Sequence, residues 1–285
     1  MPFFGVGDVR VADDSDMKYF MSICDNHEGW TLEVNKPDLQ IWCKPAPESD
    51  FKIVKLKANL KDVAANVMYD VLHDPDYRRI WDRGMIKSKD ICMINPNNDI
   101  GYYALKSPPP FKNRDFVTQR SWLQTSTEYV IFNHSVFHKE MPPQKSFIRA
   151  ISHLTGYLIK PLPDNGCVLT YVAQCDPRGK LPAWAVNKAT QYVAPKVITR
   201  LLKAAVKYPA WKKKHNPDLK PWLYPEQLKI PRINFDHIIA TPDFQDNTLD
   251  ESGVTETVGS FDAVSNEDLN GDSPLPPRKT VSPTE

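Results

Sequence analysis

The middle of the chain contains six strand-like runs in succession, and this series restricts the possible folds more than any other feature. The runs cover residues 85–94, 99–106, 116–124, 128–137, 147–159 and 168–175, with turn-forming residues between them. A "DNG" turn at Asp164–Gly166 fits a hairpin between the last two runs. Six strands with connections this short predict a strongly curved antiparallel sheet.

Helices are expected on both sides of this block. A helix follows Asp13, three strands cover residues 30–34, 39–44 and 51–60, and two helices follow, one capped by Asp62 and one beginning at Pro75. The last helix is predicted over about Ala183 to Lys207, with an apolar stripe along one side. The sequence therefore predicts an α+β fold in which a long helix closes the concave face of a nine-stranded sheet. Such an arrangement can enclose a cavity.

Composition divides the chain into two parts. Residues 12–224 are predicted to form one domain, and residues 225–285 read as a disordered acidic tail containing Pro, Ser and Thr. The tail holds one apolar island, "INFDHIIA", which is a candidate docking segment. From Glu226 on there are 12 acidic and 4 basic residues, which leaves residues 1–225 with a net charge of +9. A basic body favours an anionic surface as partner, and the tail is a possible competitor for it.

Several classes of protein are disfavoured by what the sequence lacks. Five cysteines without a C-x-x-C pair do not suggest a disulfide framework, and there is neither an 18-residue apolar run nor a basic-then-apolar N-terminus. We therefore expect a cytoplasmic protein with transient peripheral membrane contact. No RNP-like motif, zinc finger or Arg-rich tract supports nucleic acid as a partner.

Enzymatic motifs are also missing. The sequence has no G-x-S-x-G, H-E-x-x-H, Walker A or G-x-G-x-x-G pattern. His134 and His138 share a strand face but have no acidic or Cys ligand at metal spacing. We expect no catalysis, no metal and no cofactor.

The segment "YRRIWD", residues 77–82, places charged residues among bulky apolar ones. Arg78 and Asp82 are four residues apart and share one side of a helix, while Arg79 can also reach Asp82. Spacing alone leaves two interpretations open. The pair lies on the surface, where it contributes under about 1 kcal/mol, or it points inward and holds the polar end of a ligand.

Four segments together resemble a known family. They are "VLHDPDYRRIWD", "GYYALKSPPPFKNRDFVTQRSW", "IRAISHLTGYLIKPL" and "LPAWAVNKATQYVAPKVITRLLKAAVKYPAWKKKH". Over about residues 15–224 the chain resembles the START lipid-transfer domain, in its phosphatidylcholine-transfer-protein branch. The resemblance implies a helix-grip fold: a curved nine-stranded sheet around a lipid tunnel, closed by the C-terminal helix. It also implies that a single lipid is held inside and exchanged at membrane surfaces.

The resemblance further implies roles for individual residues. Arg78 matches the arginine that contacts the lipid phosphate, and Asp82 matches the aspartate that orients it. The positions of the family's aromatic cage for choline fall on Tyr103, Phe116 and His153, and Thr155 matches a polar position near the head group. Because an imidazole replaces one aromatic ring, this cage would bind choline more weakly than the family's cage. The expected ligand is therefore phosphatidylcholine or phosphatidylethanolamine.

A second site is expected at the tunnel mouth. The loop "KSPPPFKNRD", with Pro109 and an exposed Phe111, matches the family loop that lies beside the last helix. Basic residues of that helix would face anionic head groups, each contributing about 1 kcal/mol. They are Lys196, Arg200, Lys203 and Lys207.

The expected function is thus intracellular transfer of one glycerophospholipid by a monomer. Two alternatives remain: a carrier of a sterol or fatty acyl ligand, in which Arg78 hardly matters, or a lipid-sensing adaptor that acts through tail partners. Three serines of the tail are candidate phosphorylation sites, and added negative charge there is expected to weaken membrane docking. They are Ser265, Ser273 and Ser282.

Overall fold

One large sheet forms the body of the protein. The structure, a computed structural model, describes residues 3–46, 49–182, 184–185, 194–240 and 250–255. Nine strands pair antiparallel in the order β1-β2-β3-β10-β9-β7-β6-β5-β4, and the two-residue β8 pairs with β6 in parallel. The strands are β1 (Thr31–Lys36), β2 (Leu39–Ala46), β3 (Ser49–Leu60), β4 (Met85–Asn95), β5 (Asn98–Leu105), β6 (Arg114–Gln124), β7 (Tyr129–Ser135), β8 (Ile148–Arg149), β9 (Ile151–Pro161) and β10 (Cys167–Asp176). All nine predicted strands are confirmed, and the predicted run 147–159 is divided between β8 and β9.

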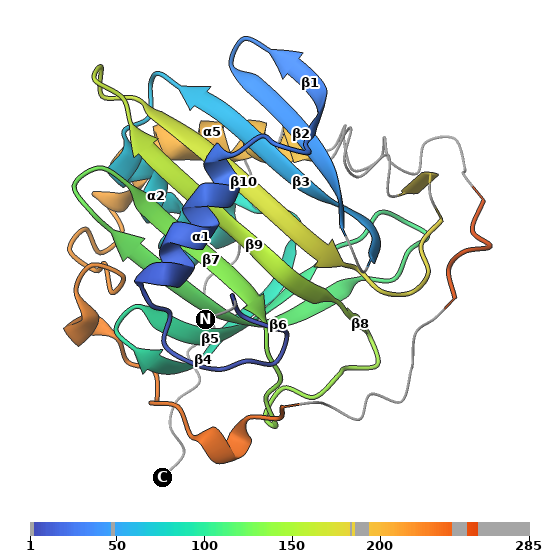
Figure 1. Ribbon diagram of the computed structural model, residues 1–285. Helices are drawn as coiled ribbons and strands as arrows, with labels where there is room; N and C mark the ends of the chain where they lie inside the picture. The colour runs from blue at the N-terminus through green and yellow to red at the C-terminus, as the bar shows by residue number, and fades with distance from the viewer. Residues whose placement is uncertain (1–2, 47–48, 183, 186–193, 241–249, 256–285) are drawn as a thin grey trace.

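Helices cover both faces of the sheet in the described part of the chain. They are α1 (Asp14–Asp25), α2 (Ala65–His73), α3 (Pro75–Trp81) and α5 (Ala194–Lys212). Figure 1 shows α1 crossing β7, β9 and β10 on one face, while α2 and α5 lie behind the sheet. We call these two sides the α1 face and the α5 face. Within the described residues, none of the helices is long and apolar enough to cross a bilayer.

Each face has its own core. On the α1 face, Phe20 of α1 packs against Phe132 and Val172. The helix approaches so closely that a Cβ on Gly156 would lie 2.6 Å from the Phe20 ring. On the α5 face, the apolar side of α5 and residues of α2 pack on the sheet, as the amphipathic pattern predicts. The main contributors there are Leu56, Met68, Leu72, Leu169, Ile198 and Leu201.

Two helix boundaries differ from the prediction. Helix α2 begins at Ala65 and its N-cap residue is Ala64, which makes no side-chain capping bond, so the prediction that Asp62 caps this helix is wrong. Asp62 lies too far upstream of Ala65 to hold the N-cap position. The final helix is described only from Ala194, and it runs to Lys212 rather than ending at Lys207. The predicted start near Ala183 falls among residues outside the description.

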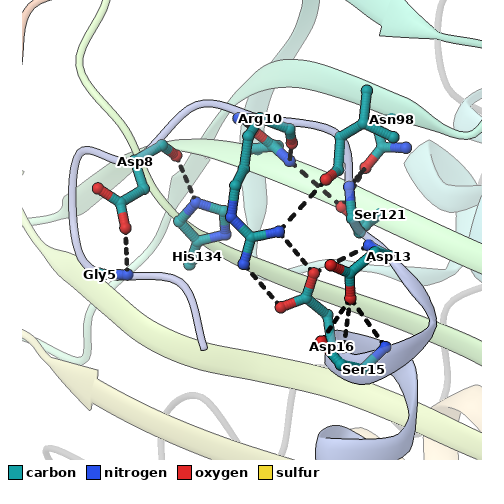
Figure 2. Close-up of polar contacts among 12 residues, drawn as sticks. Gly5, Asp8, Arg10, Asp13, Ser15, Asp16, Asn98, Ser121 and His134 are labelled. Carbon is teal, nitrogen blue, oxygen red and sulfur yellow. Dashed lines mark hydrogen bonds and ion pairs between the residues drawn. The ribbon is translucent and has the colours of Figure 1, made fainter. Parts of the chain in front are cut away.

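Residues before the predicted domain start at 12 are part of the packed structure. Phe4 is buried, and the guanidinium of Arg10 lies 3.8 Å from the centre of its ring. Arg10 donates to both carboxylate oxygens of Asp16, at 2.6 and 2.7 Å. Figure 2 shows how this segment also reaches His134, whose Nε2 lies 2.7 Å from the carbonyl oxygen of Asp8. The sequence of residues 3–11 is too short and irregular to show periodicity, and the prediction missed them for that reason.

The tail was predicted to be disordered from Pro225 onward, and two of its segments differ from that prediction. In residues 225–240, Arg232 forms a β-bridge with Met93 and Ile238 forms one with His138. The side chain of Ile233 packs against a further apolar cluster, formed mainly by β4, β5 and β6. This confirms "INFDHIIA" as a docking segment. Residues 250–255 contact loops near the end of β10, as described below. Amino-acid composition does not predict the order of either segment, because both are held in place by contacts with distant strands and loops.

Candidate functional site

Helix α3 carries the charged residues, and buried contacts fix its position. Asp74 is the N-cap and accepts hydrogen bonds from the backbone N–H groups of Asp76 and Tyr77, at 3.1 and 3.0 Å. The Tyr77 hydroxyl donates to the Ala204 carbonyl of α5 at 2.7 Å. Lys212 of α5 donates to the buried Asp74 carboxylate at 2.8 Å. These bonds hold α3 against α5, so Arg78, one residue beyond Tyr77, has a defined place.

Arg78, Asp82 and Tyr103 form one cluster. Arg78 Nε donates to Asp82 Oδ2 at 3.2 Å, and its Nη2 lies 3.4 Å from the Tyr103 hydroxyl. That hydroxyl also donates to Asp82 Oδ2 in a short hydrogen bond. The guanidinium carbon lies 4.7 Å from the centre of the Tyr103 ring. The structure therefore places Arg78 and Asp82 together, with Tyr103 bonded to both.

The cluster is neither solvent-exposed nor sealed. The Arg78 side chain keeps 29% of its surface accessible and that of Asp82 keeps 15%. Burial, the largest influence, lowers the pKa of Arg78, but the oxygens of Tyr103 and Asp82 outweigh it, so the pKa is raised and the guanidinium stays charged. Among the described residues, Nη1 of Arg78 has no hydrogen-bond partner. A charged group with an unused donor can accept an anionic ligand.

Two further tyrosines, neither of them a predicted site residue, lie near Arg78. Tyr157 of β9 and Tyr171 of β10 are directly paired, with ring centres 5.0 Å apart. Burial is the main cause that raises the pKa of both hydroxyls, and the positive charge of Arg78 opposes it. Tyr103 thus contacts the guanidinium directly, and Tyr157 and Tyr171 lie close enough to be influenced by its charge. Alternation along β9 could have drawn attention to Tyr157, since it shares a face with Thr155.

The other predicted head-group residues lie on strands β6 and β9. Phe116 pairs directly with Tyr103 across β5 and β6 and is half-buried. His153 and Thr155 lie on β9, two strands away from β6. The Thr155 hydroxyl lies 2.9 Å from Ser152 Oγ and 3.1 Å from Cys175 Sγ, so it is already engaged. Of the three predicted cage positions, Tyr103 and Phe116 are thus direct neighbours, while His153 lies two strands away, at a register shift in the pairing of β9 with β10.

The predicted gate differs from expectation at one residue. Phe111 was predicted to be exposed, but it is 7% exposed and packs on Trp184, with ring centres 5.5 Å apart. An indole lying just beyond the loop after β10 gives it an apolar partner that the local sequence did not reveal. Pro109 is exposed.

The basic side of α5 is partly described. Lys203 and Lys207 are exposed on α5, as predicted, and Arg200 is half-buried. The side chain of Lys196 is outside the description.

Other predicted features bear on the site only indirectly. No group of three or more His, Cys, Asp or Glu side chains in the described ranges could hold a metal ion. His134 and His138 are both buried. The candidate phosphorylation sites Ser265, Ser273 and Ser282 all fall within residues 256–285, which the structure does not describe.

Comparison with known proteins shows where the fold belongs. The START domain family profile matches residues 10–212. Human START domain-containing protein 10 is 43% identical over 258 residues, which cover 90% of this chain and 88% of that protein. The crystal structure of human STARD10 superposes with a TM-score of 0.78 over 83% of this chain and 97% of that one.

More distant relatives carry other names. Mouse phosphatidylcholine transfer protein is 23% identical over 184 residues, covering 63% of this chain and 85% of that protein. A rat acetyl-coenzyme A thioesterase is 27% identical over 149 residues, which are 26% of its length. The sheet order, the C-terminal helix and these matches agree with the predicted helix-grip fold, and the chain belongs to the START domain family.

Proposed function

We propose that this protein binds one glycerophospholipid, phosphatidylcholine or phosphatidylethanolamine, and transfers it between membranes without catalysis. The observation that carries the proposal is the accessible Arg78, with its unused Nη1 donor, on the face of the sheet that α5 covers. A guanidinium offers a planar set of donors that fits a phosphate diester. Membership of the START family and the likeness to mouse phosphatidylcholine transfer protein support the same ligand class.

The surroundings of Arg78 suit a zwitterionic head group. Asp82 compensates the guanidinium when no ligand is bound, and the rings of Tyr157 and Tyr171 offer faces to a choline or ethanolamine cation. One face of the Tyr103 ring is already covered by Arg78. Acyl chains would lie against the apolar residues of the α5 face. Each methylene removed from water contributes about 0.8 kcal/mol, so an apolar enclosure lowers the barrier to carrying a lipid through water.

Membrane contact and location are part of the same proposal. The exposed Lys203 and Lys207 would face anionic head groups during brief peripheral contact from the cytoplasm. We expect a monomer that needs no nucleic acid, metal or cofactor. Phosphorylation of Ser265, Ser273 or Ser282, or protein partners of the tail, would regulate this contact through charge.

Two measurements test the proposal. Native mass spectrometry of the full chain purified from cells is expected to show one phospholipid per protein. Arg78→Met is expected to lower transfer of labelled phosphatidylcholine between vesicles at least about tenfold, because a hydrogen bond to a charged group is worth about 1.5–3 kcal/mol. Arg79→Met is the matched control, since Arg79 is more exposed and pairs weakly with Asp76 at 3.8 Å. A co-purified sterol or fatty acid, together with normal transfer by Arg78→Met, would refute the proposal.

A further inference from the structure

A short piece of the tail lies between two loops at one end of the sheet. We call residues 250–255 the strap, residues 106–113 the gate loop, and residues 177–182 with Trp184 the approach loop, because this part of the chain leads toward α5. The gate loop joins β5 to β6, and the approach loop follows β10. The strap therefore comes from far along the sequence to touch both loops.

Glu251 is the buried centre of the strap. Its side chain is 6% exposed, and its Oε2 accepts a hydrogen bond of 2.6 Å from Arg114 Nη2, which is equally buried. Its other oxygen accepts from the backbone N–H of Lys112 in the gate loop at 2.8 Å. The carboxylate thus occupies a complete anion-binding position, formed by one guanidinium and one amide.

The same position is tied to the approach loop. Arg114 donates from Nε to the Pro177 carbonyl at 3.0 Å and from Nη2 to the Arg178 carbonyl at 2.9 Å. The backbone N–H of Glu251 donates to the Gly179 carbonyl at 3.0 Å. A Cβ on Gly179 would lie 3.0 Å from Arg114 and 3.1 Å from Glu251, and Gly179 has a φ of +81°. The approach loop is therefore shaped to let these two charged groups meet.

Aromatic contacts complete the closure. Trp184 donates from its indole N–H to the Val254 carbonyl of the strap at 3.1 Å. The same side chain packs on Phe111 of the gate loop. The strap, the gate loop and the approach loop thus contact one another in a closed set.

We propose that the strap is an autoinhibitory closure, in which Glu251 holds the gate loop to the approach loop and must leave before lipid enters or exits. This proposal rests on the proposed transfer function, because it describes what limits the rate of that process. Separation of the two loops would expose the Arg114 guanidinium, and an acidic segment that returns to it would close the site again. The occupant in the resting protein is the chain's own Glu251.

The two acidic residues of the strap offer a matched comparison. Asp250 pairs with Lys180 at 3.6 Å, and both side chains are more than half exposed. Water and salt screen such a pair, whereas the buried Glu251–Arg114 pair is screened far less. Glu251→Gln removes the buried charge while preserving size, and Asp250→Asn makes the same change one residue away at the surface.

The experiment uses the full-length protein and two readouts. Hydrogen–deuterium exchange is measured for peptides covering residues 106–113 and 177–182, with residues 129–135 of β7 as the internal reference. Glu251→Gln is expected to accelerate exchange at least fivefold in the two loops and to leave β7 unchanged. Its transfer of phosphatidylcholine between vesicles is expected to rise at least threefold. Asp250→Asn is expected to match the wild type in both readouts.

The outcomes separate this proposal from the proposed function. Unchanged exchange in the loops of Glu251→Gln overturns the closure, and so does faster exchange without faster transfer, because the strap would then only stabilise the fold. Equal effects of Asp250→Asn would also overturn it, since they would point to net tail charge rather than to the buried pair. If the wild type transfers no lipid, the proposed function fails, and exchange alone decides whether Glu251 holds the loops together.

Discussion

Two arginine–carboxylate pairs on this protein have opposite properties. Arg78 and Asp82 are four residues apart and keep 29% and 15% of their side-chain surfaces accessible, whereas Arg114 and Glu251 are 137 residues apart and keep 6% each. All three guanidinium nitrogens of Arg114 donate to protein oxygens. In the described structure, Nη1 of Arg78 has no such partner. An arginine with an accessible nitrogen that donates to no protein oxygen can bind a ligand, while one whose three nitrogens all donate to the protein holds loops together.

The largest expected difference between the pairs is in stability. Arg114→Met is expected to lower the free energy of unfolding by about 3–5 kcal/mol, because it leaves Glu251 buried without its counter-charge. Arg78→Met is expected to lower it by less than about 1 kcal/mol, since Asp82 is more accessible and keeps the Tyr103 hydroxyl as donor. Urea denaturation followed by circular dichroism measures both values.

A double variant provides the control for this test. Replacing both Arg114 and Glu251 by Met removes the two charges together and is expected to recover most of the loss. If Arg78→Met proves as destabilising as Arg114→Met, the distinction between a ligand-binding and a structural arginine is wrong.

A second test measures how stability depends on pH through His134, which is buried on the α1 face. The Nε2 of His134 contacts a carbonyl oxygen and must carry its proton, and Nδ1 is buried without a partner in the described structure. Burial lowers the pKa of His134 to about 4. Between its ordinary pKa of about 6.5 and about 4, the unfolded chain binds the proton and the folded one does not, so acid favours unfolding.

The size of this effect follows from the difference in pKa. His134 is expected to contribute a loss of up to about 3 kcal/mol as the pH falls from 7 to 4. The measurement is the unfolding free energy of the wild type and of His134→Leu at several pH values; His73, buried and with its pKa also lowered, titrates in both proteins. Parallel pH profiles would contradict the prediction. Arg78 stays charged between pH 7 and pH 4, so its Nη1 donor remains available over the whole range.

Features that depend on residues close together in the sequence were predictable, and those that depend on distant residues were not. Strand alternation and the amphipathic last helix depend on neighbouring residues, so the sheet and α5 were predictable. The Arg78–Asp82 pair was predictable for the same reason, because one helical turn joins its members. Glu251 was not, because nothing in its local sequence indicates a buried partner 137 residues away.

The aromatic residues near Arg78 and in the gate loop were only partly predictable. Tyr103 was identified through family resemblance as a cage residue, but its hydroxyl also bonds to Asp82 and Arg78. Alternation along β9 places Tyr157 on the same face as Thr155, but Tyr157 and Tyr171 were missed because alternation does not tell which tyrosines of that face lie near a charge. Phe111 was placed at the surface because a proline-rich loop reads as exposed, although Trp184 covers it.

The smallest expected effect tests whether Tyr103 helps to keep the Arg78 donor available. Tyr103→Phe retains the ring beside the guanidinium but removes the hydroxyl that donates to Asp82 Oδ2. Asp82 would then turn its free lone pairs to Arg78 and compete with a phosphate for the same donors. We expect phosphatidylcholine transfer to fall about fivefold, equivalent to about 1 kcal/mol, which is typical of one hydrogen bond. Tyr129→Phe makes the same change elsewhere in the sheet and should leave transfer unaltered. A Tyr103→Phe protein that transfers as fast as the wild type would show that Asp82 alone positions Arg78. The Arg78–Asp82 pair would then resemble the Arg114–Glu251 pair, in which Glu251 is the side chain bonded to the guanidinium, more closely than we propose.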